Sequence, residues 1–173
     1  KDLYPLCQFK STTIDAGIGY DSYAWSTGET TQKITVTSPG SYWLVVTEDH
    51  GGGLICDMKK EFIVFLSNPA SIRFTTTTDW TLYENQIVIY ATGLGDYEYS
   101  VDGENYQDSN VFTNLKHGIQ KIYVRDKHNC GIVNEDVFLL VYPKFFTPND
   151  DNYNDTWKIE FSEMEPGMTI TIV

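Results

Sequence analysis

Basic residues are scarce in this chain of 173 residues, in which 12 Lys and Arg side chains stand against 24 Asp and Glu side chains. Binding to nucleic acid or to anionic lipid depends on clustered Lys and Arg that neutralise phosphate groups. The formal net charge of -12 therefore argues against nucleic acid as a partner and against direct docking on an anionic membrane. A solubilising acidic surface is the better interpretation.

Long apolar runs are missing as well. No segment of the sequence is apolar over the length that is needed to cross a bilayer. The opening residues, Lys1 to Pro5, lack the features of a signal peptide. If the protein is exported, we expect its signal to lie upstream of this chain.

The sequence also lacks the short motifs of familiar catalytic chemistries. It has no Gly-x-Ser-x-Gly elbow, no phosphate-binding P-loop and no His-Glu-x-x-His zinc motif. Its three histidines, His50, His117 and His128, are scattered over predicted turns. Carboxylates are too numerous to exclude a glycosidase by motif alone, but a β-sandwich of this size without an assembled site is more often structural. We expect no enzymatic activity.

What the sequence does contain is an apolar alternation with a period of two residues, which is typical of β-strands. Helical spacing is nowhere sustained. The alternating runs are rich in β-branched and aromatic residues, and Gly, Asn, Asp and Pro bound them. They predict strands over residues 34–37, 42–47, 62–66, 86–91, 119–125 and 137–141.

An internal repeat organises these strands. The Tyr-Ala-Trp-Ser sequence at residues 23–26 is echoed by Tyr-Glu-Tyr-Ser at 97–100, and the alternating run after Gly40 is echoed after Gly118. Each copy then enters an acidic turn that contains a histidine. We interpret the repeat as two copies of one module, joined near residues 67–69.

The spacing of strands and turns predicts an all-β protein of immunoglobulin-like or PKD-like β-sandwiches in tandem. We expect the first sandwich over residues 1–67 and the second over 68–142. Both copies resemble the Ig-like repeats of large Bacteroidetes surface proteins, through the sequences at residues 16–31 and 97–106. This resemblance implies spacer domains.

Trp25 lies between Cys7 and Cys56 in the sequence. In immunoglobulin domains a buried Trp packs on a disulfide between the two sheets, so we expect Trp25 in the core, with sugar stacking as the alternative. Cys7 and Cys56 flank the strands of the first module, and we expect a disulfide between them. Cys130 would then be a free thiol. The three cysteines form no CxxC or Cys/His zinc pattern.

Two other tryptophans are candidate exposed aromatics. Trp43 points to the face opposite Tyr42 and Leu44 if its strand is regular. With Trp80 it is a candidate platform for a surface glycan, against surface packing or contact between domains. This supports a rival interpretation of the chain as a carbohydrate- or host-binding adhesin module.

The most constrained stretch lies near the end of the sequence. The seven positions from Asn149 to Asp155 are Asn or Asp, with the exception of Tyr153. The segment lies between Pro148 and Trp157. Side chains of this kind bond to their own backbone and tolerate left-handed conformations. We therefore predict a tightly constrained loop that is held between apolar anchors.

This stretch resembles the opening of the type B C-terminal sorting region of type IX secretion cargo, the gliding-motility-associated C-terminal domain of Bacteroidetes surface proteins. The pattern of that family is Phe-Thr-Pro-Asn-Gly-Asp-Gly, any residue, Asn-Asp, and then an aromatic residue two positions on. Asp150 and Asn152 replace its two glycines. Because Asn and Asp occupy left-handed positions better than other non-glycine residues, we expect the loop geometry to be kept. The later motifs of the family are absent, so residues 143–173 would be the start of a truncated, β-rich sorting domain.

The resemblance implies that the chain is the C-terminal part of a secreted cell-surface cargo protein, exported across the outer membrane. Its partners would be type IX translocon components and an outer-membrane barrel of the PorP/SprF kind. The resemblance gives as candidate partner-binding residues Phe145, Phe146, Thr147, Pro148, Asn149, Asp151, Asn154, Asp155 and Trp157.

The acidic loop also offers oxygen ligands that suit calcium, and the candidate ligands are Asp150, Asp151, Asn152 and Asp155. An EF-hand is rejected, because Asp155 stands where that loop needs glycine and Phe161 stands where it needs a bidentate Glu. The alternative is that the side chains only make Asx-turn hydrogen bonds to the loop backbone.

The final residues, 168–173, predict a strand with no turn after it. Unpaired strand edges recruit partners, so we expect this strand to be disordered, completed by further residues, or paired with another protein. We also expect Phe145, Phe146 and Trp157 to be buried against a barrel or against the loop itself.

Overall fold

A computed structural model describes residues 1–78, 85–141, 145–153 and 155–159, together with 163, 167 and 169. Every named element in these residues is a β-strand, and none of the described segments is a helix that could cross a membrane. The chain divides into two compact units. Module 1 comprises residues 1–68 and 94–96, and module 2 comprises residues 69–93 and 97–173.

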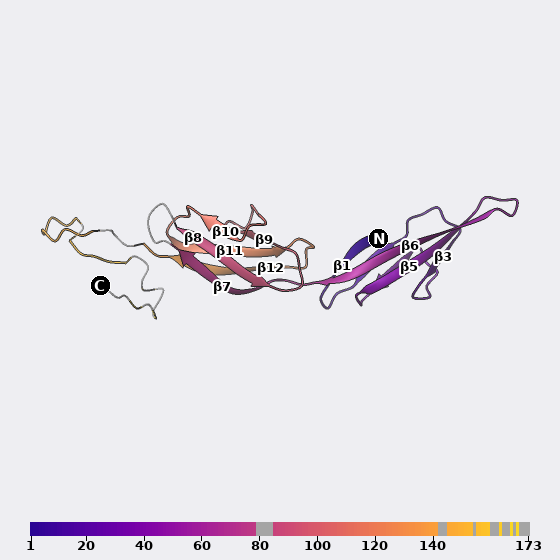
Figure 1. The fold of residues 1–173 in the computed structure, drawn as a ribbon, viewed down its shortest axis with the longest axis horizontal. Coiled ribbons are helices and arrows are strands. Elements are labelled where there is room, and N and C mark those ends of the chain that lie inside the picture. Colours follow the sequence, from indigo (N-terminus) through magenta and orange to yellow (C-terminus); the bar gives the residue numbers. More distant parts are fainter. Residues whose placement is uncertain are drawn as a thin grey trace. The chain divides into compact units, whose positions relative to one another are not determined.

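Module 1 contains six strands in two sheets (Figure 1). The strands are β1 (Asp2–Cys7), β2 (Thr12–Asp15), β3 (Ser22–Trp25), β4 (Lys33–Val36), β5 (Gly40–Asp49) and β6 (Ile55–Ser67). One sheet has the order β1-β6-β5-β3, and β2 pairs with β4 in the other. β1 runs parallel to β6, whereas the remaining pairs are antiparallel. In an immunoglobulin sandwich the strands that correspond to β3, β5 and β6 form one sheet, and those that correspond to β2 and β4 pair in the other. Module 1 has the same arrangement.

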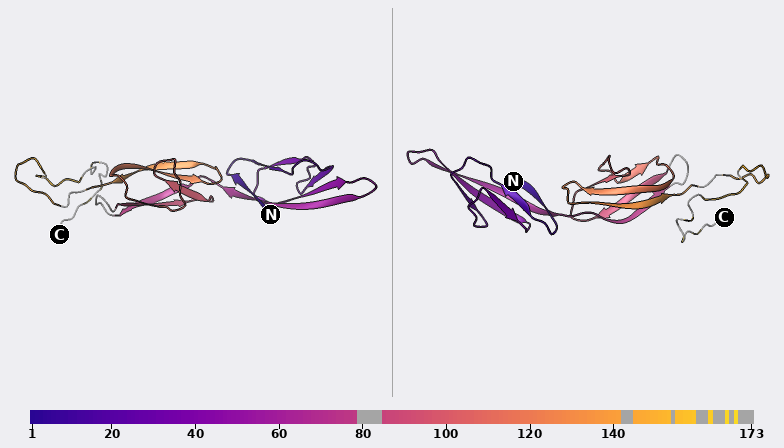
Figure 2. Two further views of the ribbon diagram at one scale, coloured as in Figure 1. Left: turned by 90° about the horizontal axis from the view of Figure 1, so that it is seen from above. Right: turned by 180° about the vertical axis from the view of Figure 1, so that it is seen from behind.

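The described residues of module 2 also form six strands. They are β7 (Ser71–Thr78), β8 (Gln86–Thr92), β9 (Tyr97–Ser100), β10 (Val111–Thr113), β11 (Gly118–Asp126) and β12 (Ile132–Leu139). The sheets have the orders β10-β8-β7 and β12-β11-β9. Figure 2 shows the two sheets of each module as separate layers. This order is also immunoglobulin-like, so the fold predicted from the sequence is confirmed.

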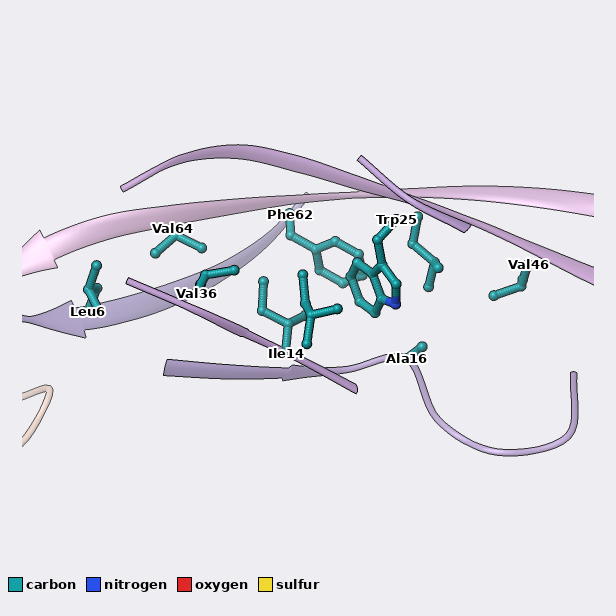
Figure 3. Close-up of a cluster of buried hydrophobic side chains, with 10 residues drawn as sticks. Leu6, Ile14, Ala16, Trp25, Val36, Val46, Phe62 and Val64 are labelled. Atoms are coloured by element: carbon teal, nitrogen blue, oxygen red, sulfur yellow. The ribbon is translucent and has the colours of Figure 1, made fainter. Parts of the chain in front are cut away.

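The core of module 1 is built around Trp25, which is 3% exposed. Its ring lies 5.6 Å from the ring of Phe62, and Figure 3 shows both rings directed toward Ile14 on the opposite sheet. The indole Nε1 donates a hydrogen bond to the carbonyl oxygen of Thr31 at 2.7 Å. The prediction of Trp25 as a core residue is confirmed, and its one polar atom has a partner, as a buried indole requires.

Among the described residues of module 2, the buried members of the core include no indole. These are Ala70, Ile87, Ile89, Ile122, Val124, Val137 and Leu139. Residues of β8 and β11 supply most of them at alternate positions, which is the period expected of strands that bury one face.

All six strands predicted from the alternation are present, as β4, β5, β6, β8, β11 and β12. The strands that the alternation missed have short or polar sequences. β2 has four residues and β10 has three, while β7 is mostly threonine after Phe74. β1 contains Pro5, which a strand tolerates at the edge of a sheet, and β1 lies at the edge of its sheet.

The repeat needs one correction. In module 1 Tyr23 lies opposite Val46, whereas in module 2 it is Tyr99 that lies opposite Val124. Val46 and Val124 are equivalent by their distances from Gly40 and Gly118, so Tyr99 is the counterpart of Tyr23. The pairing of residues 23–26 with 97–100 is therefore wrong by two residues. A shift of two keeps every side chain on its face, which is why the sequence similarity concealed it.

Candidate functional sites

The tail loop, defined here as residues 145–153 and 155–159, is organised by the carboxylate of Asp155. The backbone N–H groups of Asn149 and Asp150 donate to its Oδ1 at 2.9 and 2.8 Å, and the N–H of Asn152 donates to its Oδ2 at 2.7 Å. One side chain thus satisfies three backbone donors, which matches the Asx-turn interpretation of the acidic loop.

Two non-glycine residues of the tail loop have left-handed backbones. Asp150 has a φ of 60° and Asn152 has a φ of 65°. These are the two positions at which the sorting-region pattern has glycine. Both residues occupy the left-handed conformation that glycine adopts most readily, as expected from their types, and the likeness of the whole loop to the sorting region stays a prediction.

A second carboxylate, that of Asp151, closes the other side of the loop. Its Oδ1 accepts the backbone N–H of Tyr153 at 2.7 Å, and its Oδ2 accepts the Nδ2 of Asn149 at 2.9 Å. The hydroxyl of Thr147 donates to the carbonyl oxygen of Tyr153 at 3.2 Å. Asn154, a further candidate, lies outside the described residues.

These contacts shift the pKa of Asp155. Removal from water alone raises the pKa, but the backbone N–H groups of Asn149, Asn152 and Asp150 stabilise the ionised form, so the pKa lies below its ordinary value of 3.8. The loop therefore favours a charged Asp155 at neutral pH.

The aromatic residues of the tail loop are largely exposed. Phe145 is 67% exposed, Phe146 is 51% exposed and Tyr153 is 78% exposed, whereas Trp157 is half-buried. The expectation that Phe145 and Phe146 pack against their own loop is wrong. Burial against a barrel stays a prediction. Sequence reasoning also missed Ile159, which is 5% exposed.

Two of the four calcium ligands proposed from the sequence, Asp151 and Asp155, accept hydrogen bonds from N–H groups of the loop itself. Among the described residues, no three His, Cys, Asp or Glu side chains are grouped as they would be around a metal ion. The hydrogen bonds account for the carboxylates of Asp151 and Asp155, and a calcium site that includes Asp150 and Asn152 stays a prediction.

Trp43 is the exposed aromatic of module 1, at 41%, and it lies on the face of β5 opposite the buried Leu44. The Nζ of Lys59 lies 5.7 Å from the centroid of its ring, and Glu61 is its partner on β6. Lys59 and Lys1 both contact the Glu61 carboxylate, at 3.5 and 3.1 Å. The predicted face and exposure of Trp43 are confirmed, its role as a glycan platform stays a prediction, and Trp80 lies outside the described residues.

The disulfide expected between Cys7 and Cys56 is wrong. Cys56 is a free, exposed thiol, whereas Cys7 and Cys130 are disulfide-bonded. Cys7 lies opposite Ser67 at one end of β6, and Cys56 lies near the other end of the same strand. Eleven residues of strand separate those positions by about 36 Å, far more than the roughly 4.4–6.8 Å between Cα atoms that a disulfide spans.

Solved structures of immunoglobulin-domain proteins are similar to this chain. An amphioxus IgVJ-C2 molecule matches at 16% identity with a TM-score of 0.35, over 78% of this chain and 98% of its own. The N-terminal eight Ig domains of Down Syndrome Cell Adhesion Molecule match at 11% identity and a TM-score of 0.39, over 82% of this chain and 23% of theirs. The N-terminal four Ig domains of a Dscam1 isoform match at 13% identity with a TM-score of 0.36, over 79% of this chain and 42% of their own. At these TM-scores the likeness carries no argument about function.

No protein-family model matches the chain, and no curated protein matches it at a significant level.

Proposed function

We propose that this chain is the C-terminal part of a secreted surface protein, in which two immunoglobulin-like spacer modules carry the start of a type IX sorting region. The tail loop is the feature that supports the proposal most strongly. It combines the sequence pattern of the sorting region with left-handed backbones at Asp150 and Asn152, where that pattern has glycine. The spacer modules would hold the upstream part of the protein away from the cell surface.

The tail loop would act as a rigid recognition element. Asp155 and Asp151 tie the loop to itself, and this leaves Phe145, Phe146 and Tyr153 exposed. Exposed aromatic side chains on a rigid support are the residues that most often supply binding energy at protein interfaces. The partner that fits the proposal is an outer-membrane barrel of the PorP/SprF kind, together with type IX translocon components.

The proposal is tested by fusing the complete sorting region of the natural protein to a periplasmic reporter in a type IX host. We expect surface display of the fusion. Replacing both Phe145 and Phe146 by Ala should retain the reporter inside the cell, because the exposed rings are removed while the Asp155 hydrogen bonds remain. Asp155→Ala should also retain it, through loss of the loop structure.

A matched control restores the family pattern. The double variant Asp150→Gly and Asn152→Gly keeps the left-handed backbone without side chains, so it should be displayed as well as the parent. Unchanged display of the Phe145 and Phe146 double variant would remove these rings from the recognition surface. Unchanged display of Asp155→Ala would show that the loop is only a local structural element.

A second candidate function is glycan binding by module 1, and the exposure of Trp43 favours it. An exposed indole beside charged, hydrogen-bonding side chains is a surface on which a sugar ring can stack. The test is a glycan array probed with the parent chain and with Trp43→Ala. Binding that is lost in the variant would support an adhesin module, and binding that Trp43→Ala leaves intact would exclude this platform.

A further inference from the structure

The outer face of β5 carries Trp43 on a strand whose two neighbours are both described. β5 lies between β3 and β6 in its sheet (Figure 1). Leu44 and Val46 are buried in the core of module 1, so Trp43 points to the outer face. Among the described residues, Trp43 takes part in none of the close pairs of aromatic rings. The indole therefore presents ring surface to solvent in the middle of the sheet.

Two side chains of opposite charge flank this ring on β6. Glu61 lies directly opposite Trp43, and Lys59 lies two residues before Glu61, so both side chains point to the same outer face. The Nζ of Lys59 is 5.7 Å from the centroid of the indole ring and 3.5 Å from the Oε1 of Glu61. The Nζ of Lys1 is 3.1 Å from the Oε2 of the same carboxylate. An ammonium and a carboxylate thus lie together beside the exposed indole.

The Glu61 carboxyl is held in its ionised form. Hydrogen bonding and charge from Lys1, and then from Lys59, lower the pKa of Glu61 below its ordinary value of 4.5. An ionised carboxylate only accepts hydrogen bonds, whereas an ammonium only donates them. A ligand that bonds to both groups must therefore both donate and accept, as hydroxyl groups do.

Module 2 shows that the fold does not require an indole at this position. Its counterpart of Trp43 is Lys121, which lies three residues after Gly118, as Trp43 lies three residues after Gly40. Lys121 lies opposite Asp136, and its Nζ is 3.5 Å from the Oδ1 of that carboxylate. The same place in the sheet therefore holds a charged pair in module 2 and an indole opposite a carboxylate in module 1.

We propose that the outer face around Trp43 binds an uncharged pyranose sugar, in which C–H groups stack on the indole and hydroxyl groups bond to Lys59 and Glu61. One hydroxyl would accept a hydrogen bond from the Lys59 ammonium, and another would donate to the Glu61 carboxylate. The inference rests on the glycan-binding candidate proposed above, and it adds the class of ligand and two residues that determine specificity.

The charge of the protein favours an uncharged sugar over an acidic one. The formal net charge is -12, and an ionised Glu61 lies beside the ring, so both repel a sugar that carries a carboxylate. Lys59 already contacts Glu61, so it cannot balance a second carboxylate. Because an open sheet face encloses less of a ligand than a concave pocket does, the affinity is low, with a Kd of about 1 mM.

The first test is an NMR titration of the parent chain with cellohexaose, mannohexaose and galactohexaose as uncharged probes and hexagalacturonate as the acidic probe. The indole N–H signal of Trp43, assigned by its loss in Trp43→Ala, reports binding. We expect at least one uncharged probe to shift this signal, and hexagalacturonate to bind at least tenfold more weakly. Tighter binding of hexagalacturonate would leave the glycan platform standing and overturn the inferred class of ligand. A signal that none of the four probes shifts overturns both.

The second test examines the two specificity residues with the uncharged probe that binds best. Lys59→Met and Glu61→Gln should each weaken binding about tenfold, because each removes a hydrogen bond to a charged group. Lys60→Met is the matched control and should leave the Kd unchanged, since Lys60 lies opposite Leu44 and points to the other face of the sheet. Unchanged melting temperatures would show that the variants are folded. Equal weakening by Lys60→Met, or parental affinity in both Lys59→Met and Glu61→Gln, overturns the assignment of these residues.

Discussion

Module 1 packs its core around one indole, whereas the buried core residues that the structure describes in module 2 are aliphatic. In the corrected register the counterpart of Trp25 is Val101, which is half-buried against the core of module 2. The modules also place their first strands differently: β1 joins the sheet of β6, while β7 joins the sheet of β8. The difference shows that the repeat preserves one pair of central strands, β5 and β11, and lets the elements around them change.

The largest expected effect follows from removing the indole. Trp25→Ala should destabilise module 1 by about 3–5 kcal/mol, since it leaves a cavity beside Phe62 and a lost hydrogen bond to Thr31. Val101→Ala removes two carbons from a half-buried site and should cost module 2 about 1 kcal/mol. Denaturant unfolding of the two variants measures both losses. Equal losses of unfolding free energy in the two variants would show that Trp25 and Val101 contribute equally to the cores of their modules.

Reduction of the cysteines should have the next largest effect. Cys7 and Cys130 are disulfide-bonded, so a reductant should lower the stability of the chain by about 2–4 kcal/mol. Cys56→Ser is the matched control and should leave the melting temperature unchanged. Without reductant, an alkylating reagent should label Cys56 alone. Labelling at Cys7 or Cys130 in the native, unreduced protein would contradict this assignment.

Removal of the Asp155 carboxylate should affect the tail loop and leave both modules intact. Asp155→Ala frees the N–H groups of Asn149, Asp150 and Asn152, so their amide hydrogens should exchange faster. The melting temperatures of the modules should not change. Amide exchange followed by NMR separates the two effects, and protected amides in the variant would show that the backbone holds the loop without this side chain.

Acidification should weaken the hydrogen bonds that two carboxylates accept, those of Asp15 in module 1 and of Asp155 in the tail loop. In module 1, hydrogen bonds from Lys33, Gly17 and Gln32 lower the pKa of Asp15 to about 2. A carboxylate with a lowered pKa stabilises the fold above its ordinary pKa of 3.8, and this contribution is lost as the pH falls from 3.8 toward 2. The pKa of Asp155 is also lowered, so its contribution to the tail loop is lost in the same direction as the pH falls. Carboxyl titration by NMR checks both residues, and an ordinary pKa at either one would exclude its hydrogen bonds in solution.

The smallest effect is expected from Trp43. Its ring is partly exposed and contacts Lys59 on the outer face of the sheet, so Trp43→Ala should cost less than about 1 kcal/mol. The comparison with Trp25→Ala tests whether Trp25 lies on the core face of its sheet and Trp43 on the outer face. Similar denaturation midpoints for the two variants would show that both rings contribute equally to the core.

The sequence predicts the strands that bury one face, because alternation is a direct result of burial. β5 and β11 show it in the run of buried residues at Leu44 and Val46 and at Ile122 and Val124. β1 and β10 give no such signal, because their positions depend on strands far away in the sequence. The tail loop was predictable for a different reason: Asn and Asp side chains form their hydrogen bonds within a few residues.

The disulfide could not be predicted, because flanking a module in sequence does not bring two cysteines together in space. Cys7 and Cys56 lie toward opposite ends of β6, and only the parallel register of β1 reveals this.

The parallel pairing of β1 with β6 has a mechanical consequence. When the reduced module 1 is stretched between Lys1 and Ser67, the pull acts along two neighbouring strands in opposite directions. The six residue pairs from Asp2 to Cys7 then resist the load together, in shear, and do not open one after another. Among the described strands of module 2, the first and the last, β7 and β12, belong to different sheets and form no such pair. In a chain that is held at one end and loaded at the other, module 1 should be the part that yields last.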